Sequence, residues 1–208
     1  MTDIQIKSKK RVADFGEVYT NEQEVNAMLD SVKDMFIKID STFLEPAAGN
    51  GNFLVEILKR KIEVVKKKYK KSQFEYERYA FITISTIYGI DILEDNVHEC
   101  RERLYKVFNV NYTSLYKNNC SDKIRQSIKY VLSKNIICGD SLTGLKNGEE
   151  AEPIMFSEWT IFHNYVERLD FAMCDLLVYE KMNTKKILIP KPRKIFTRTD
   201  FREVSTLG

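Results

Sequence analysis

The stretch FLEPAAGNGNFL, residues 43–54, decides the fold, because it joins a short apolar run to a glycine turn and then to a helical pattern. Gly49 and Gly51 have only Asn50 between them, so the backbone can approach a ligand closely. The following helix offers unpaired N–H groups at its first turn, and Glu45 adds a carboxylate beside the turn. The pattern predicts a strand-to-helix turn that binds a cofactor. It lacks the third glycine of the dinucleotide fingerprint.

The bulk composition favours one globular domain, with or without a tail. The chain has 208 residues, 43% of them hydrophobic and 30% charged, and its formal net charge of +3 is too small to require a nucleic-acid partner. We expect reduced thiols and no metal site, because no metal-binding spacing links Cys100, Cys120, Cys138 and Cys174. Neither a secretion signal nor a run of about 18 apolar residues occurs, so a cytoplasmic protein without a membrane span is expected.

Helical and strand patterns alternate along the chain. Helices are predicted over residues 21–39, 50–71, 94–108 and 122–133, and strands over 42–45, 80–92 and 135–138, with an irregular segment over 109–121. Two further apolar segments, 152–159 and 165–179, predict either a hairpin or two more strands. This order is typical of an α/β protein with a mostly parallel sheet flanked by helices, whose ligands bind at the carboxyl ends of the strands.

Three predicted strands each end in an acidic residue, namely Glu45, Asp91 and Asp140. On a parallel sheet these positions line one crevice, where Asp91 is well placed to accept hydrogen bonds from ribose hydroxyls. The alternative is that each acid only caps the next helix. Asp91 lies far beyond the roughly 20-residue interval of a dinucleotide site, which argues against a nicotinamide enzyme.

Four segments together resemble the class I methyltransferases that bind S-adenosylmethionine, specifically the adenine-specific (N6) DNA methyltransferases of restriction-modification systems. DFGEVYT (14–20) is similar to the family's segment before the first helix, and residues 43–53 to its glycine motif. YGIDI (88–92) resembles its ribose-binding motif, and ICGDSL (137–142) the motif that meets the adenine of the cofactor. The resemblance covers roughly residues 12–145.

This resemblance implies a Rossmann-like class I methyltransferase fold over residues 1–180, truncated or complete, followed by a basic tail over 181–208. It also implies S-adenosylmethionine as the cofactor. The residues that it assigns to the cofactor are Phe15 and Thr20 near the methionine moiety, Glu45, Ala47, Gly49 and Gly51 around the turn, Asp91 on ribose, and Asp140 and Ser141 beside adenine. Core packing of Phe15 and a turn cap at Asp140 are the alternatives.

The family's base-holding motif, an Asp, Asn or Ser followed by two prolines and an aromatic residue, does not occur in this sequence. Such a motif accepts hydrogen bonds from the target amine and stacks on the extruded base. The best candidate for its acceptor is Asp175, which Leu-Leu-Val follows in place of Pro-Pro-aromatic. Ser157 and Trp159 make a second near-match at the wrong interval.

Three functions therefore stay open: adenine methylation with Asp175 as the catalytic acceptor, a non-catalytic methyltransferase-fold subunit or cofactor-sensing partner, and a small-molecule or protein methyltransferase. We expect no target-recognition domain within this length, so a second methylase or a specificity subunit is a candidate partner. The basic run from Lys66 to Lys71 and the tail from Lys181 could contact DNA phosphates. A solvated helix face and a solubilising tail are the alternatives.

Overall fold

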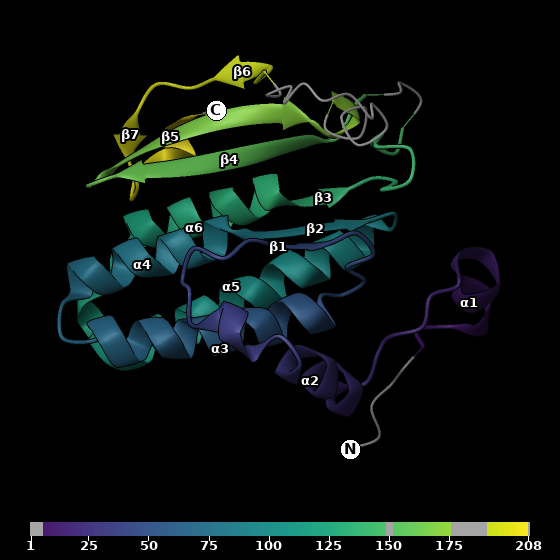
Figure 1. Cartoon of the computed structure of the whole chain (residues 1–208), viewed down its shortest axis with the longest axis horizontal. Helices are drawn as coiled ribbons and strands as arrows, with labels where there is room; N and C mark the ends of the chain where they lie inside the picture. Colours follow the sequence, from purple (N-terminus) through teal and green to yellow (C-terminus); the bar gives the residue numbers. More distant parts are fainter. Residues whose placement is uncertain (1–5, 149–151, 176–190, 208) are drawn as a thin grey trace.

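A parallel sheet of three strands forms the centre of the computed structural model, which describes residues 6–148, 152–175 and 191–207 (Figure 1). β1 (Phe43–Glu45), β2 (Ile87–Asp91) and β3 (Ile136–Cys138) lie side by side in this order. Leu44 is opposite Tyr88, and Asp91 is opposite Cys138. The three carboxyl ends therefore meet at one edge, in a mixed α/β arrangement that is compatible with a Rossmann-like fold.

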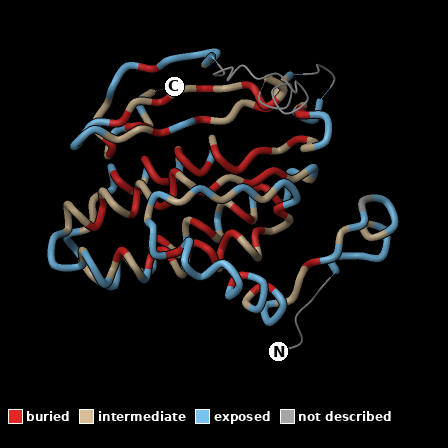
Figure 2. The backbone as a smooth tube through the Cα atoms, in the orientation of Figure 1, coloured by how far each residue is buried: buried red, intermediate tan, exposed pale blue. Residues whose placement is uncertain are grey.

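Four long helices pack together and contribute most of the core, and the first and third of them lie against one face of this sheet. They are α3 (Asn52–Tyr69), α4 (Gln73–Ser85), α5 (Glu94–Tyr116) and α6 (Asp122–Asn135). In α3 the buried residues Leu54, Leu58, Ile62 and Val65 recur at helical spacing, so one side of the helix is apolar. Figure 2 shows the same alternation of buried and exposed turns along the helices.

A separate antiparallel sheet covers the other face (Figure 1). β4 (Met155–Phe162) and β5 (Tyr165–Ala172) form a hairpin, and the short strands β6 (Lys194–Ile195) and β7 (Thr199–Asp200) both pair with β5. The hairpin alternative of the sequence analysis is confirmed. The parallel sheet, in contrast, has only three strands in the described part of the chain, because the four later strands belong to this second sheet.

The described part of the basic C-terminal segment packs onto the body of the protein. Phe201 and Val204 are fully buried, and the ring of Phe201 meets Phe74 and Phe81 edge-on. The 3-10 helix η3 (Val204–Leu207) lies against α6. Phe201 and Val204 therefore belong to the hydrophobic core of the domain.

The predicted strand over residues 80–92 is wrong in its first half, which belongs to α4. Ser72 caps this helix by accepting a hydrogen bond from the Glu75 N–H. The buried side chains Tyr76, Ala80 and Ile84 then follow at intervals of four, against α3 and α6. Packing against neighbouring helices outweighs the strand preference of the β-branched residues here.

Two predicted boundaries also need correction. The segment 109–121 is mostly helical, because α5 continues to Tyr116 with Tyr112 fully buried in series with Leu104 and Phe108. The 3-10 helix η2 (Lys117–Asn119) follows. The helix predicted over 21–39 is capped by Asn21, but α2 (Glu22–Asp30) is shorter and the 3-10 helix η1 (Lys33–Phe36) comes after it.

Candidate functional site

A pocket of about 460 Å³ opens at the carboxyl ends of the three parallel strands. This volume is within the usual range of small-molecule sites, about 300–1,000 Å³. Its walls come from residues 16–20, the glycine turn after β1, the start of α5 after β2, and the turn after β3. Seven of the predicted residues line it, namely Thr20, Glu45, Ala47, Gly49, Asp91, Asp140 and Ser141.

Phe15 and Gly51 were also predicted to touch the cofactor, and of these two Gly51 does not line the described wall. Phe15 is the last residue of α1 (Lys9–Phe15), and its side chain lies outside the described part of the structure. Gly51 precedes α3 with a φ of 89°, and a Cβ added there would lie 2.6 Å from the Cys100 Sγ. The close packing of the turn onto α5 therefore requires this glycine.

The glycine turn is tied to the end of β2 by two hydrogen bonds. The Gly49 N–H donates to Asp91 Oδ2 at 2.8 Å, and the Ala48 N–H donates to the Ile90 carbonyl at 2.8 Å. Asp91 Oδ1 accepts from the Leu93 N–H and from the Asn96 amide. Asp91 thus joins the turn to the first residues of α5 from a position in the pocket wall.

The other two strand-end acids differ in their surroundings. Burial raises the pKa of Glu45, although a hydrogen bond from the Ala47 N–H opposes this. Asp140 Oδ1 accepts from the Leu142 N–H at 2.8 Å, so the turn cap that the sequence left open is present at this residue. Both carboxylates remain part of the pocket lining.

An N-terminal segment closes one side of the pocket through contacts that the sequence did not reveal. Arg11 donates to both carboxylate oxygens of Glu17, at 2.5 and 2.7 Å, and to Asp95 at 2.6 Å. The Asn96 amide donates to Glu17 as well, at 2.6 Å. Burial favours the neutral acid, but these donors and the Tyr19 hydroxyl hold the pKa of Glu17 below its ordinary value. Residues 16–20 are thereby fixed against α5.

The pocket lining is strongly acidic. Glu17, Glu45, Asp91 and Asp140 all line it, and no lysine or arginine does so among the described residues. Arg11 compensates the charge of Glu17, and the other three carboxylates leave the lining negative, which favours a cationic ligand over a diphosphate. Within residues 6–148, 152–175 and 191–207, no group of three or more His, Cys, Asp or Glu side chains could hold a metal ion. None of the described helices is both long and apolar enough to cross a membrane.

Asp175, the candidate acceptor, does not line the pocket. Its two oxygens accept from the Arg193 guanidinium at 2.6 and 2.7 Å, and this ion pair lowers its pKa. The second near-match serves the interior of the antiparallel sheet. The Ser157 hydroxyl donates a hydrogen bond to the buried Asp170, and the Trp159 indole N–H donates one to Asn135. The Ser157 hydroxyl and the Trp159 ring are therefore both occupied and do not face a site where an extruded base could bind.

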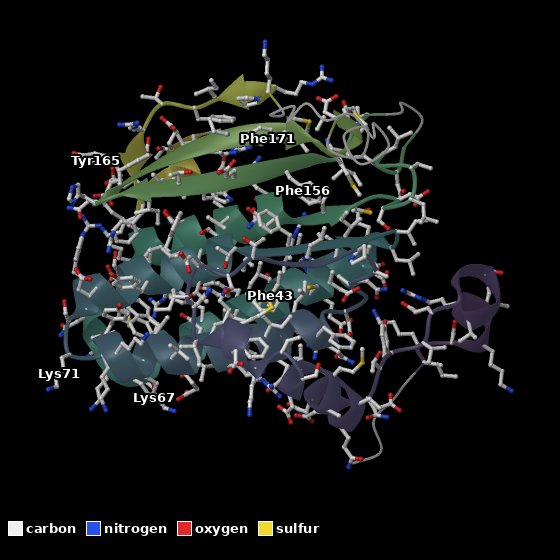
Figure 3. All side chains as sticks on the ribbon, viewed as in Figure 1. Phe43, Lys67, Lys71, Phe156, Tyr165 and Phe171 are labelled. Carbon is white, nitrogen blue, oxygen red and sulfur yellow. The ribbon has the colours of Figure 1, made fainter. Side chains whose placement is uncertain are left out.

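The basic run from Lys66 to Lys71 lies at the opposite end of α3 from the pocket. Asn52 begins the helix beside the pocket, and Lys66 lies 14 residues further on, roughly 20 Å along the axis. Figure 3 shows Lys67 and Lys71 projecting at that far end. Contacts of this run with DNA would therefore be remote from the pocket.

Comparison with known proteins gives one partial similarity. Over 133 residues, 62% of this chain, it is 27% identical to a protein of Methanocaldococcus jannaschii described as a "Putative type II restriction enzyme and methyltransferase". The chain spans about a tenth of the length of that relative, with 10% covered. No family model matches the chain. No solved structure matches it either. The similarity relates part of this chain to a restriction-modification protein.

Proposed function

We propose that the pocket binds S-adenosylmethionine and that the chain is the cofactor-binding part of an adenine-specific DNA methyltransferase of a restriction-modification system. The acidic lining around the glycine turn is the observation that carries this proposal. S-adenosylmethionine carries an ammonium, a sulfonium and one carboxylate, and this net positive charge suits Glu45, Asp91 and Asp140, whereas the diphosphate of a dinucleotide does not. The similarity to a protein described as a restriction enzyme and methyltransferase supports the same function.

The lining residues fit this cofactor chemically. Glu45 would accept hydrogen bonds from the ammonium group, Asp91 from the ribose hydroxyls, and Asp140 from the adenine amino group. Thr20 and Ser141 add hydroxyls, and Ala47 and Gly49 leave room for the ligand beside the turn. When bound, the cofactor supplies an electrophilic methyl group. Glu17 and Arg11 would hold the wall that shields it from water.

The methyl-transfer step requires an acceptor that orients the target amine. Asp175 would do this by accepting the amine's N–H groups, and its carboxylate would first have to leave Arg193. The same ion pair favours the second candidate function, a non-catalytic subunit or cofactor sensor. In that case a partner chain supplies the base-holding residues.

Calorimetry with S-adenosylmethionine tests the cofactor proposal. We expect saturable binding for the wild-type chain, no binding of NAD at the same concentrations, and at least tenfold weaker binding for Asp91→Ala. Glu102→Gln, an exposed acid on α5, is the matched control and should bind like the wild type. Thermal unfolding verifies that each variant is folded. Absence of heat at millimolar S-adenosylmethionine would overturn the proposal.

A labelling experiment separates the two candidates. The chain is incubated with methyl-labelled cofactor and unmethylated DNA, and label is then measured in the DNA, protein and small-molecule fractions. Label in DNA that disappears in Asp175→Ala establishes DNA methylation by this chain, and recovery of the label as N6-methyladenine assigns it to adenine. Cofactor binding without transfer establishes the non-catalytic function, and label in another fraction would identify a different methyltransferase.

A further inference from the structure

A second concavity, about 300 Å³ in volume, lies between the parallel sheet and the hairpin. Thr42 and Leu44 border it on the side of β1, Tyr88 forms its floor, and Phe156, Glu158 and Phe171 form the hairpin wall. Figure 3 labels Phe156 on β4 and Phe171 on β5 in this wall. The rings of Tyr88 and Phe156 meet edge-on, with centroids 5.7 Å apart. The surface, which we call the β1 groove, is mainly apolar.

One border of the β1 groove is the outer edge of the parallel sheet. In the described part of the chain β1 pairs with β2 alone. The Phe43 N–H donates to the Thr86 carbonyl on that side. Because backbone groups alternate in direction along a strand, the N–H and C=O of Leu44 point to the other side. Among the described residues they have no pairing strand, and they form a short open edge beside the groove.

The exposure of this strand is unusual for its type. Parallel strands are normally covered on both faces. Phe43 faces the helices and stacks on Phe36, but Leu44, on the groove face, is 51% exposed. An apolar strand with an open edge is a template for pairing with another chain.

We propose that the β1 groove binds an extended segment of a partner polypeptide, which adds a strand to β1 and places alternate apolar side chains against Leu44, Phe156 and Phe171. The open N–H and C=O groups of Leu44 can pair with an added strand. Main-chain pairing of this kind, with pockets for alternate side chains, is an established mode of recognition. Glu158 is the one charged residue among the described lining residues, so the segment carries a basic side chain opposite it. In the relative, nine-tenths of the polypeptide lies outside the matched part, which offers ample chain for such a segment.

The carbonyl of Ser157 on β4 also faces this space and accepts from the Tyr88 hydroxyl at 2.8 Å. This bond fixes the separation between the two walls of the β1 groove. The described lining residues of the β1 groove and of the cofactor pocket do not overlap, so we expect the groove to bind its segment with or without the cofactor.

Selection from a displayed library of random 12-residue peptides on the immobilised chain tests the proposal. We expect enriched peptides with apolar residues at alternate positions and a lysine or arginine. Their affinity should fall at least tenfold on Leu44→Lys and stay unchanged on Met28→Lys, where the wild-type residue is a comparably exposed apolar side chain on α2. Glu158→Lys should weaken binding, and a peptide with its basic residue changed to Glu should restore it.

The wild-type protein provides a second measurement that does not depend on folding of variants. The selected peptide is N-methylated either at its odd-numbered or at its even-numbered residues. One of these two peptides should lose binding and the other should keep it, because only alternate N–H groups face β1. Failure to enrich any peptide, or binding that ignores Leu44→Lys and N-methylation, would overturn the proposal. A dimer by sedimentation that Leu44→Lys dissociates would also overturn it, by assigning the groove to a second copy of this chain. Calorimetry with S-adenosylmethionine reports on the other proposal independently.

Discussion

At the scale of single residues, two glycines with left-handed backbone allow the cost of backbone strain to be measured apart from the cost of a steric clash. Gly16 has a φ of 65° and open space where a Cβ would be, whereas Gly51 has Cys100 in that place. We expect Gly16→Ala to cost about 1 kcal/mol, and Gly51→Ala to cost about 2 kcal/mol or more. Urea unfolding measures both. Adding Cys100→Ala should recover part of the Gly51→Ala loss, and no recovery would contradict the packing explanation.

We expect the ionised Glu45 carboxylate to lower the stability of the folded chain and to strengthen binding of the cofactor. Because burial raises its pKa, the ionised carboxylate at neutral pH costs free energy in the folded state, and this cost disappears as the pH falls below the ordinary value for Glu. Glu45→Gln should therefore stabilise the ligand-free chain at pH 7 and lose this advantage near pH 4. Its affinity for S-adenosylmethionine should fall about tenfold, equivalent to about 1.4 kcal/mol.

Urea unfolding at the two pH values and calorimetry check these effects of Glu45→Gln. Asp122→Asn, at an exposed carboxylate on α6, is the control. Unchanged cofactor affinity in Glu45→Gln would remove Glu45 from the site.

At the scale of elements, we expect α1 to affect cofactor binding by holding residues 16–20 in the wall of the pocket. Arg11→Ala removes the cation from Glu17, whose side chain is only 7% exposed. We expect residues 16–20 to loosen and cofactor affinity to fall about tenfold. Hydrogen exchange at residues 16–20 and calorimetry are the measurements. Arg198→Ala, which breaks an exposed ion pair with Glu167, should change neither.

The far end of α3 allows DNA contact to be tested apart from the pocket. Reversing the charges at Lys67 and Lys71 should leave cofactor affinity unchanged, because both lie far from the pocket. If they contact phosphates, the slope of log affinity for DNA against log salt should fall by about 0.9 for each lost contact. An unchanged slope would assign the run to a solvated helix face.

At the scale of the whole molecule, Lys61 links stability to pH. Burial lowers its pKa to about 7, and its ammonium or amine donates to the Ser41 carbonyl and the Thr86 hydroxyl between α3 and the sheet. Above pH 7 the unfolded chain binds a proton that the folded chain does not. The free energy of unfolding of the wild type, relative to Lys61→Met, should therefore rise between about pH 7 and 9.

The size of this effect of Lys61 is bounded at about 1.4 kcal/mol per pH unit. Urea unfolding of both proteins at three pH values measures it, and the comparison cancels the tyrosines and thiols that also titrate. The exposed Lys106→Met should give no such slope. A flat difference for Lys61→Met would mean that the lysine stays charged in the folded protein.

The sequence allowed the pocket to be predicted better than the rest of the molecule. Glu45 and Asp91 end strands and Asp140 lies in the turn after β3, so local patterns and the geometry of parallel sheets suffice to bring them together. The contact of Arg11 with Asp95 joins residues 84 positions apart, and no local spacing encodes it. The helical first half of the predicted strand 80–92 depends on packing against α3 and α6, which outweighs local preference.

The thiol of Cys100 lies under Gly51 and is fully buried, and burial raises its pKa to about 12. The thiolate is the nucleophile that attacks an alkylating reagent, so we expect this cysteine to react only when the glycine turn lifts away from α5. The rate at which Cys100 is modified therefore reports how often the turn opens. The half-exposed Cys120, Cys138 and Cys174 serve as internal references. A ligand that holds the turn closed would slow this rate in proportion to its occupancy, without any label on the ligand.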